Sequence, residues 1–173
     1  KIWIQIMSNI VAIVGRPNVG KSTIFNRFTE SRQAITDEIS GVTRDRHYGK
    51  AEWNGREFSV IDTGGYVEGS VDIFENEIRK QVELAIDEAN VILFLVDAKT
   101  GITDLDQAVV SLLRKSNKKV VLAVNKVDNS RLLEDAVEFY NLGLGEYIPV
   151  ASISGSGTGE LLDELLKHFE DDV

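Results

Sequence analysis

One stretch of the chain has the residue types and spacing of a phosphate-binding loop. It runs from Gly15 to Ser22 and reads Gly-Arg-Pro-Asn-Val-Gly-Lys-Ser. Its two glycines allow the backbone to curl so that successive N–H groups point into one concavity, and a helix that begins there adds partial positive charge. Lys21 can reach terminal phosphates, and the Ser22 hydroxyl can ligate a magnesium ion. A chance glycine-rich turn is the alternative interpretation of this stretch.

The elements on either side of the loop are those that a phosphate site requires. The apolar run 10–14 precedes the loop and predicts a buried strand, while residues 23–28 predict the first turns of a helix. This order of strand, glycine loop and helix favours phosphate binding over a chance turn. The predicted phosphate contacts come from Asn18, Val19, Gly20, Lys21, Ser22 and Thr23.

Composition narrows the classes of protein to which the chain can belong. Its 173 residues suit one domain with one core. The formal net charge of −9 argues against nucleic-acid binding by this domain itself, because phosphate backbones require an excess of Lys and Arg. The absence of cysteine excludes disulfides and thiolate metal sites and suits a reducing cytoplasm. No apolar run approaches the length of a membrane span.

The two ends of the chain differ from the region between them. Met7 is the only methionine, and we interpret residues 1–8 as a short stretch foreign to the natural protein followed by its natural start at Met7. The alternative is that the first residues form an added edge strand. Residues 9–170 are expected to form the single domain. Residues 171–173 continue an acidic tail that would suit the start of an interdomain linker.

Strand and helix patterns alternate along the chain. Asn54-Gly55 separates two extended runs, 47–53 and 56–61, and predicts an antiparallel hairpin. Further strands are predicted at 91–96, 120–124 and 147–151, and helices near 72–89, 103–115, 131–140 and 158–169. We therefore expect an α/β fold: a three-layer αβα sandwich around a mostly parallel six-stranded sheet with one antiparallel strand. Ligand loops belong at the carboxyl ends of its strands.

Five stretches fall where such ligand loops should lie. They are the phosphate loop, residues 41–45 around Thr43, 62–65, 125–128, and 151–152 with the glycines that follow. Their order and spacing resemble the small GTP-binding proteins, a branch of the P-loop NTPases, over residues 9–169. The runs 37–46, 53–56 and 62–66 resemble more closely the first GTPase domain of the EngA (Der) family of bacterial ribosome-assembly GTPases.

The run 125–128 predicts the choice of base. A carboxylate at Asp128 can accept from the N1–H and the exocyclic amine of guanine, whereas adenine has no such pair of donors. Asp128 therefore favours GTP and GDP over ATP as the ligand and argues against the alternative of an ATP-dependent enzyme. Asn125 and the stem of Lys126 would support the base and tie this loop to the phosphate loop, as the resemblance implies. The alternative is a helix cap, with Asp128 and Asn129 bonding only local backbone.

A second loop is expected at the base. In the family it reads Ser-Ala, and the resemblance implies that the backbone N–H of the second residue meets guanine O6. Here the order is Ala151-Ser152, followed by Ile153. Because a backbone group makes the contact, we expect the changed order to be tolerated.

The resemblance also implies a switch that depends on the γ-phosphate. Asp62 would hold magnesium through a water, Thr43 would be a second magnesium ligand beside Ser22, and the N–H of Gly65 would meet the γ-phosphate. Residues 30–46 and 65–72 should then order with GTP and relax with GDP. A solvated turn threonine is the alternative for Thr43.

Hydrolysis requires a residue that orients the attacking water. Ras-like proteins use a glutamine immediately after the second glycine of the stretch that corresponds to 62–65. That position holds Tyr66, so intrinsic turnover should be slow. In related GTPases an asparagine at the position of Asn18 helps to bind potassium, which predicts potassium-stimulated hydrolysis; the alternative is that Asn18 only shapes the loop. The catalytic group expected from the resemblance is Asn18, Lys21, Thr43 and Gly65.

The resulting prediction is a magnesium-dependent hydrolase of GTP that acts as a conformational switch in biogenesis of the large ribosomal subunit. A nucleotide-gated interaction module with negligible hydrolysis in the absence of a partner is the alternative. The resemblance implies a second GTPase domain and an RNA-binding-type domain outside this chain, ribosomal contact through those parts, and a cytoplasmic protein without membrane association.

Overall fold

Six strands form one sheet in the computed structural model, which describes residues 9–30, 47–64 and 74–169. The sheet order is β2-β3-β1-β4-β5-β6. The strands are β1 (Ile10–Val14), β2 (His47–Trp53), β3 (Arg56–Asp62), β4 (Val91–Asp97), β5 (Lys119–Asn125) and β6 (Tyr147–Pro149). All neighbouring pairs are parallel except β2 with β3. The predicted mostly parallel sheet with one antiparallel strand is confirmed.

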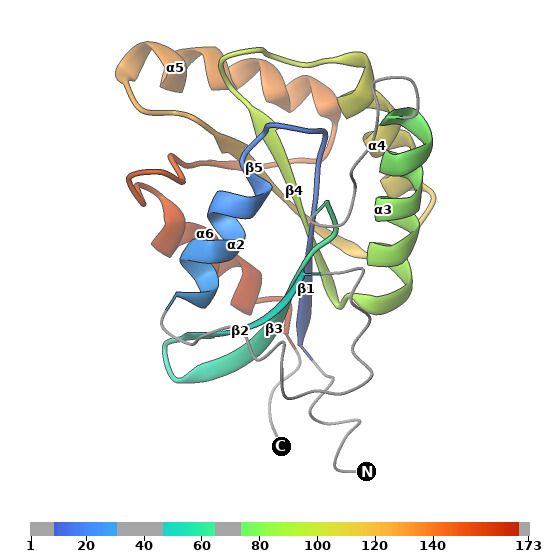
Figure 1. The fold of residues 1–173 in the computed structure, drawn as a ribbon. Coiled ribbons are helices and arrows are strands. Elements are labelled where there is room, and N and C mark those ends of the chain that lie inside the picture. The colour runs from blue at the N-terminus through green and yellow to red at the C-terminus, as the bar shows by residue number, and fades with distance from the viewer. Residues whose placement is uncertain (1–8, 31–46, 65–73, 170–173) are drawn as a thin grey trace.

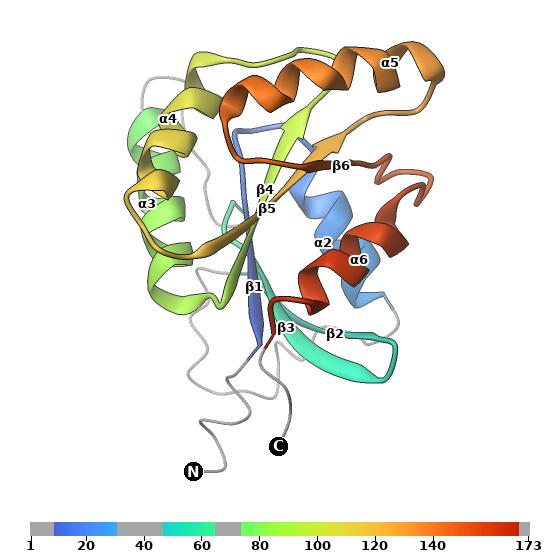
Figure 2. The same ribbon diagram turned by 180° about the vertical axis from the view of Figure 1, so that it is seen from behind.

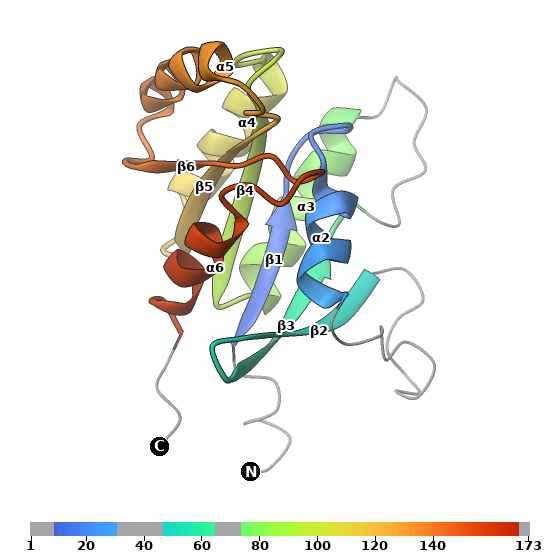
Figure 3. The same cartoon turned by 90° about the vertical axis from the view of Figure 1, so that its left-hand side faces the viewer.

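Helices cover both faces of this sheet (Figure 1, Figure 3). They are α2 (Lys21–Thr29), α3 (Phe74–Glu88), α4 (Asp104–Arg114), α5 (Ser130–Asp135), the 3₁₀ helix η2 (Ala136–Leu142) and α6 (Thr158–Leu166). The apolar residues of α2 and α6 pack on one face, and those of α3, α4 and η2 pack on the other. The three-layer αβα architecture is therefore confirmed.

Strand β1 shows why its sequence is apolar without alternation. Val11 and Ile13 pack on the side of α2, whereas Ala12 and Val14 pack on the side of α3, and all four are fully buried. A parallel strand covered on both faces needs apolar side chains at every position. Burial on both sides fixes the end of β1, and with it the start of the loop at Gly15.

The hairpin of β2 and β3 turns at Asn54-Gly55 as predicted. Both residues have positive φ, 52° and 79°, which is the conformation of a type I′ turn. Trp53 and Arg56 pair directly at the base of the turn. Figure 2 shows the hairpin beside α6, to which Trp53 Nε1 donates a 2.7 Å hydrogen bond at Asp163 Oδ1.

The predicted helix at 131–140 is wrong in its second half. Regular α-helix ends at Asp135, and η2 continues to Leu142. Ala136, Phe139 and Leu142 are all buried and lie three residues apart, which matches the three residues per turn of a 3₁₀ helix. Burial of this stripe therefore favours the tighter helix.

Other boundaries differ by a few residues. The first helix begins at Lys21, two residues before its predicted start, and the last strand ends at Pro149 instead of residue 151. Ala151 instead forms an isolated bridge with Ser156. Residues 1–8, Thr43, Gly65, Tyr66 and residues 171–173 lie outside the described residues. Within the described ranges, none of the helices has the length and hydropathy needed to cross a bilayer.

Candidate functional site

A cavity of about 920 Å³ opens at the carboxyl ends of the parallel strands. Its lining comes from the phosphate loop, the end of β3 and the loops after β4, β5 and β6. The lining residues are Pro17, Asn18, Gly20, Lys21, Ser22, Thr23, Asp62, Gly64, Lys99, Asn125, Lys126, Asp128, Ala151, Ser152, Ile153 and Ser154. Every predicted site residue within the described ranges is among them except Val19. The side chain of Val19 is fully buried in the core, so this residue can offer a ligand only its backbone.

The phosphate loop curls tightly around the side chain of Lys21. A Cβ on Gly15 would lie 2.6 Å from the carbonyl oxygen of Leu95, so only glycine allows the loop to leave β1 at this point. Lys21 Nζ donates to the carbonyl oxygens of Gly15, at 2.7 Å, and Arg16, at 2.9 Å. Burial of Lys21 lowers its pKa to about 8, against the opposing attraction of Asp62. Phosphate groups would favour the charged form of this lysine.

Ser22 and Asp62 place two oxygen ligands side by side. Ser22 Oγ donates to Asp62 Oδ2 at 3.2 Å, and Asp62 Oδ1 accepts from the N–H of Gly64 at 3.1 Å. Asp62 is only 1% exposed. In the described part of the chain no three His, Cys, Asp or Glu side chains gather into a metal cluster. One hydroxyl and one carboxylate nevertheless fit Mg²⁺, which is held by few protein ligands and keeps waters and phosphate oxygens.

Asn125 joins the phosphate loop to the loop after β6. Its Nδ2 donates to the carbonyl oxygen of Val19 at 2.8 Å and to Ser152 Oγ at 2.9 Å. Its Oδ1 accepts from the N–H of Ser152 at 2.9 Å. Positions 19, 125 and 152 are therefore fixed relative to one another through one buried amide.

The last of these bonds bears on the expectation for Ser152. Its N–H, which the resemblance assigned to guanine O6, is instead bound to Asn125. Ile153, next along the chain, is 85% exposed and lines the cavity. Sequence reasoning also missed Arg27, whose guanidinium donates to the carbonyl oxygens of Ser152 and Ile153 at 2.8 Å each.

Asp128 lies at the mouth of the cavity with its side chain 51% exposed. Its Oδ2 is 3.5 Å from Lys99 Nζ, a lining residue that sequence reasoning missed. The helix cap that was the alternative for this stretch is made by Asn129, whose side chain accepts from the N–H of Leu132 at 2.9 Å. Asn129 thus supplies the cap, and the Asp128 carboxylate remains at the cavity.

Lys126 adopts the left-handed backbone conformation, with φ of 67°, which is uncommon for a residue other than glycine. Its Nζ donates to the carbonyl oxygen of Asn18 at 2.9 Å and pairs with Asp97 Oδ2 at 2.9 Å. These contacts stabilise the unusual backbone and lay the stem of Lys126 across the cavity wall. Asn18 shares this conformation, with φ of 68°.

Taken together, a phosphate loop between a buried strand and a helix, in an αβα sandwich, defines a P-loop nucleotide-binding protein. A family model described as 50S ribosome-binding GTPase matches residues 10–126, and the chain belongs to this family. The predicted membership of a GTPase family is confirmed.

Curated relatives give the same result. The chain is 71% identical over 163 residues to a protein named GTPase Der from Flavobacterium psychrophilum, a match that covers 94% of this chain and 37% of that protein. It is 60% identical over 163 residues to the GTPase Der of Bacteroides thetaiotaomicron, with the same two coverages. The predicted resemblance to the Der family is confirmed, and the chain spans less than two fifths of the length of these relatives.

Solved structures share the fold. A crystal structure of Era in complex with MgGDPNP and nucleotides 1506–1542 of 16S ribosomal RNA matches with a TM-score of 0.72 and 28% identity, over 95% of this chain and 58% of that one. The G domain of the FeoB iron transporter of T. maritima matches with a TM-score of 0.65 and 25% identity, over 92% and 98%.

Proposed function

We propose that this chain binds GTP and GDP in the cavity and hydrolyses GTP to GDP and phosphate. The observation that carries the proposal is the placement of two ends of one site on a single cavity: the phosphate loop with Lys21 at one end, and Asp128 at the other. A volume of about 920 Å³ accommodates a nucleotide. Membership of the GTPase family supports the same assignment.

Each group at the phosphate end has a chemical role in this proposal. The N–H groups from Asn18 to Thr23 and the Lys21 ammonium bind phosphate oxygens. Ser22 and Asp62 would hold a magnesium ion, which neutralises phosphate charge when bound. Thr43 as a further ligand of that ion and Gly65 as a donor to the γ-phosphate remain predictions from the resemblance.

The base end selects guanine. The Asp128 carboxylate accepts from the two neighbouring donors of guanine, and adenine offers no matching pair. Lys126 covers the base with its stem, and the loop formed by Ala151, Ser152 and Ile153 borders it. Because Asn125 already bonds the N–H of Ser152, the next residues in this loop supply the backbone donors.

The proposal of potassium-stimulated hydrolysis rests on Asn18 and on Tyr66, which stands in the sequence where Ras-like proteins have a glutamine. Asn18 lines the cavity beside Lys21, where a monovalent cation would meet charge that develops on the phosphates. Tyr66 cannot orient water as a carboxamide does. Switch behaviour of residues 30–46 and 65–72 belongs to the same proposal.

Single-turnover release of phosphate tests this proposal directly. The chain is loaded with GTP and magnesium and followed in potassium and in sodium buffers of equal ionic strength. We expect release in both buffers and faster release in potassium. Equal rates would remove the potassium role, whereas tight binding without release would favour the nucleotide-gated module that needs a partner.

The wider role also stays a proposal. The description of the family supports action on the large ribosomal subunit, and the 37% coverage of a relative suits a longer protein. The second GTPase domain, the RNA-binding-type domain and the cytoplasmic location remain predictions from the resemblance. The net charge of −9 makes direct RNA binding by this chain unfavourable.

A further inference from the structure

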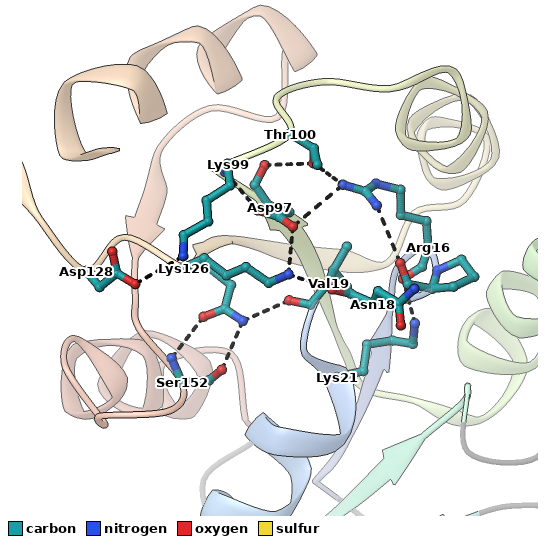
Figure 4. A network of polar contacts seen from close by, with 12 residues as sticks. Arg16, Asn18, Val19, Lys21, Asp97, Lys99, Thr100, Lys126, Asp128 and Ser152 are labelled. Carbon is teal, nitrogen blue, oxygen red and sulfur yellow. Dashed lines mark hydrogen bonds and ion pairs between the residues drawn. The ribbon is translucent and has the colours of Figure 1, made fainter. Parts of the chain in front are cut away.

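Asp97 stands between the two ends of the cavity and belongs to neither predicted loop. It is the last residue of β4, and its side chain is only 4% exposed. Figure 4 places it at the centre of the polar network that connects the phosphate loop with Lys126. A carboxylate buried to this extent needs charged or hydrogen-bonding partners, and those partners indicate its role.

One oxygen of Asp97 faces two cations from different loops. Its Oδ2 is 2.9 Å from Lys126 Nζ and 4.0 Å from Arg16 Nη2. Arg16 belongs to the phosphate loop, and Lys126 belongs to the loop after β5. Because Lys126 Nζ also donates to the carbonyl oxygen of Asn18, the lysine reaches the phosphate loop as well. A single carboxylate therefore links the loop that would hold phosphates to the loop that would hold the base.

The other oxygen of Asp97 has a separate, local role. Its Oδ1 accepts from the N–H of Lys99 at 2.8 Å and closes the turn after β4. Lys99 in turn places its Nζ 3.5 Å from Asp128. The local turn thus accounts for Oδ1 alone, and Oδ2 is left for the contacts between loops.

Arg16 completes the link on the side away from the cavity. Its guanidinium donates to Thr100 Oγ1, and its Nε is 3.6 Å from Oδ1 of the fully buried Asp106. Asp106 also closes the capping box at the start of α4. Arg16 is absent from the residues that line the cavity, so its side chain acts on the phosphate loop from behind.

We propose that Asp97 is a positioning residue that sets the separation between the phosphate loop and the base-binding loop. This inference rests on guanine-nucleotide binding as proposed above. With phosphates anchored at one loop, the contact of Asp128 with the base depends on that separation. Removing the charge of Asp97 leaves two buried or half-buried cations without their shared partner, which loosens both loops.

The substitution Asp97→Asn separates the two roles. Asparagine keeps an oxygen for the N–H of Lys99, but it replaces the anionic oxygen that faces Lys126 and Arg16. We expect binding of GDP, measured by calorimetry, to weaken by at least ~10-fold. The preference for GDP over IDP, which lacks the exocyclic amine, should also fall by at least ~3-fold because Asp128 no longer meets the base in register.

Asp104→Asn is the matched control, since it removes an exposed carboxylate from the first turn of α4 and should leave both quantities unchanged. Asp97→Asn with unchanged GDP affinity, or with weaker binding and an intact GDP-to-IDP ratio, would overturn the inference. If Asp97→Asn does not fold, Arg16→Gln replaces it with the same expected pattern and the same overturning results. Failure of the unaltered chain to bind GDP would instead refute the proposed function.

Discussion

Asn125 directs nearly all of its hydrogen-bonding capacity to the protein itself. Its amide nitrogen bonds Val19 and Ser152, and its oxygen bonds the backbone of Ser152. Its contribution to the site is therefore to hold two loops together. In the proposed function base selection falls on Asp128, whose half-exposed carboxylate has only Lys99 within ion-pair distance among the described residues.

Asp128→Asn should exchange the preferred base. An amide presents a donor where the carboxylate accepted, so the amine of guanine loses its partner while the C2 oxygen of xanthine gains one. We expect affinity for GDP to fall by about 10- to 100-fold, the value of hydrogen bonds to a charged group, and affinity for XDP to rise. Competition of GDP and XDP for the variant checks this, with Asp135→Asn on the exposed side of α5 as control. An unchanged preference for GDP would contradict the role of Asp128.

Lys21 should make nucleotide binding depend on pH. Its pKa in the chain is lowered to about 8 by burial, and phosphate charge would raise it. Binding therefore takes up a proton above pH 8, so the affinity for GDP is fully developed below pH 8 and falls as the pH rises further, by at most ~10-fold per pH unit.

Calorimetry at pH 8.5, without divalent metal, in buffers of different ionisation enthalpy measures this proton uptake. The observed binding enthalpy should vary with the buffer for the unaltered chain and not for Lys21→Met, if that variant binds at all. An enthalpy that is independent of the buffer would show that Lys21 does not change its protonation on binding.

At the scale of elements, the strands were the easiest part to predict. Continuous apolar runs such as 10–14 and 91–96 are typical of strands buried on both faces, and Asn54-Gly55 specifies its turn by backbone conformation alone. The ends and the types of the helices were harder to predict. The pattern of polar and apolar residues across α5 and η2 fits the spacing of an α-helix and that of a 3₁₀ helix alike. Tertiary burial of Phe139 and Leu142 decides between these spacings.

Gly20, at the start of α2, and Gly55, in the turn between β2 and β3, are two glycines whose substitution can be compared. Both have positive φ, 108° and 79°, so alanine at either position costs about 1–2 kcal/mol of unfolding free energy. A Cβ on Gly20 would also collide with Nδ2 of Asn125, whereas a Cβ on Gly55 meets nothing within 4 Å. Gly20→Ala should therefore abolish measurable GDP binding, and Gly55→Ala should only lower the melting temperature. Normal GDP binding by Gly20→Ala would contradict the close packing of phosphate loop and Asn125.

At the scale of the whole molecule, the sequence predicted that the ligand loops lie at one edge of the sheet, because parallel strands bring their carboxyl ends together there. The described parts of four of them, at 15–22, 62–64, 125–128 and 151–152, do line one cavity, and residues 41–45 lie outside the described residues. The sequence also predicted the tie from Asn125 and Lys126 to the phosphate loop, which their bonds to Val19 and Asn18 show.

The sequence could not reveal the links made by Arg16 and Arg27. Arg16 meets Asp97 and Asp106 across more than 80 residues, and Arg27 meets Ser152 across 125. No local periodicity encodes such pairs, since they follow from the order of strands in the sheet. Asp97 at the end of β4 was visible in sequence only as a polar residue that closes an apolar run.

The account depends on one cavity that grips a guanine nucleotide at both ends, and titration calorimetry with GDP and ADP under identical magnesium conditions tests it most directly. We predict saturable binding of GDP at one site and at least ~100-fold weaker binding of ADP, because ADP can use the phosphate loop but leaves the Asp128 carboxylate facing the base without a donor. Equal affinity for the two nucleotides, or no binding of GDP, would contradict the account.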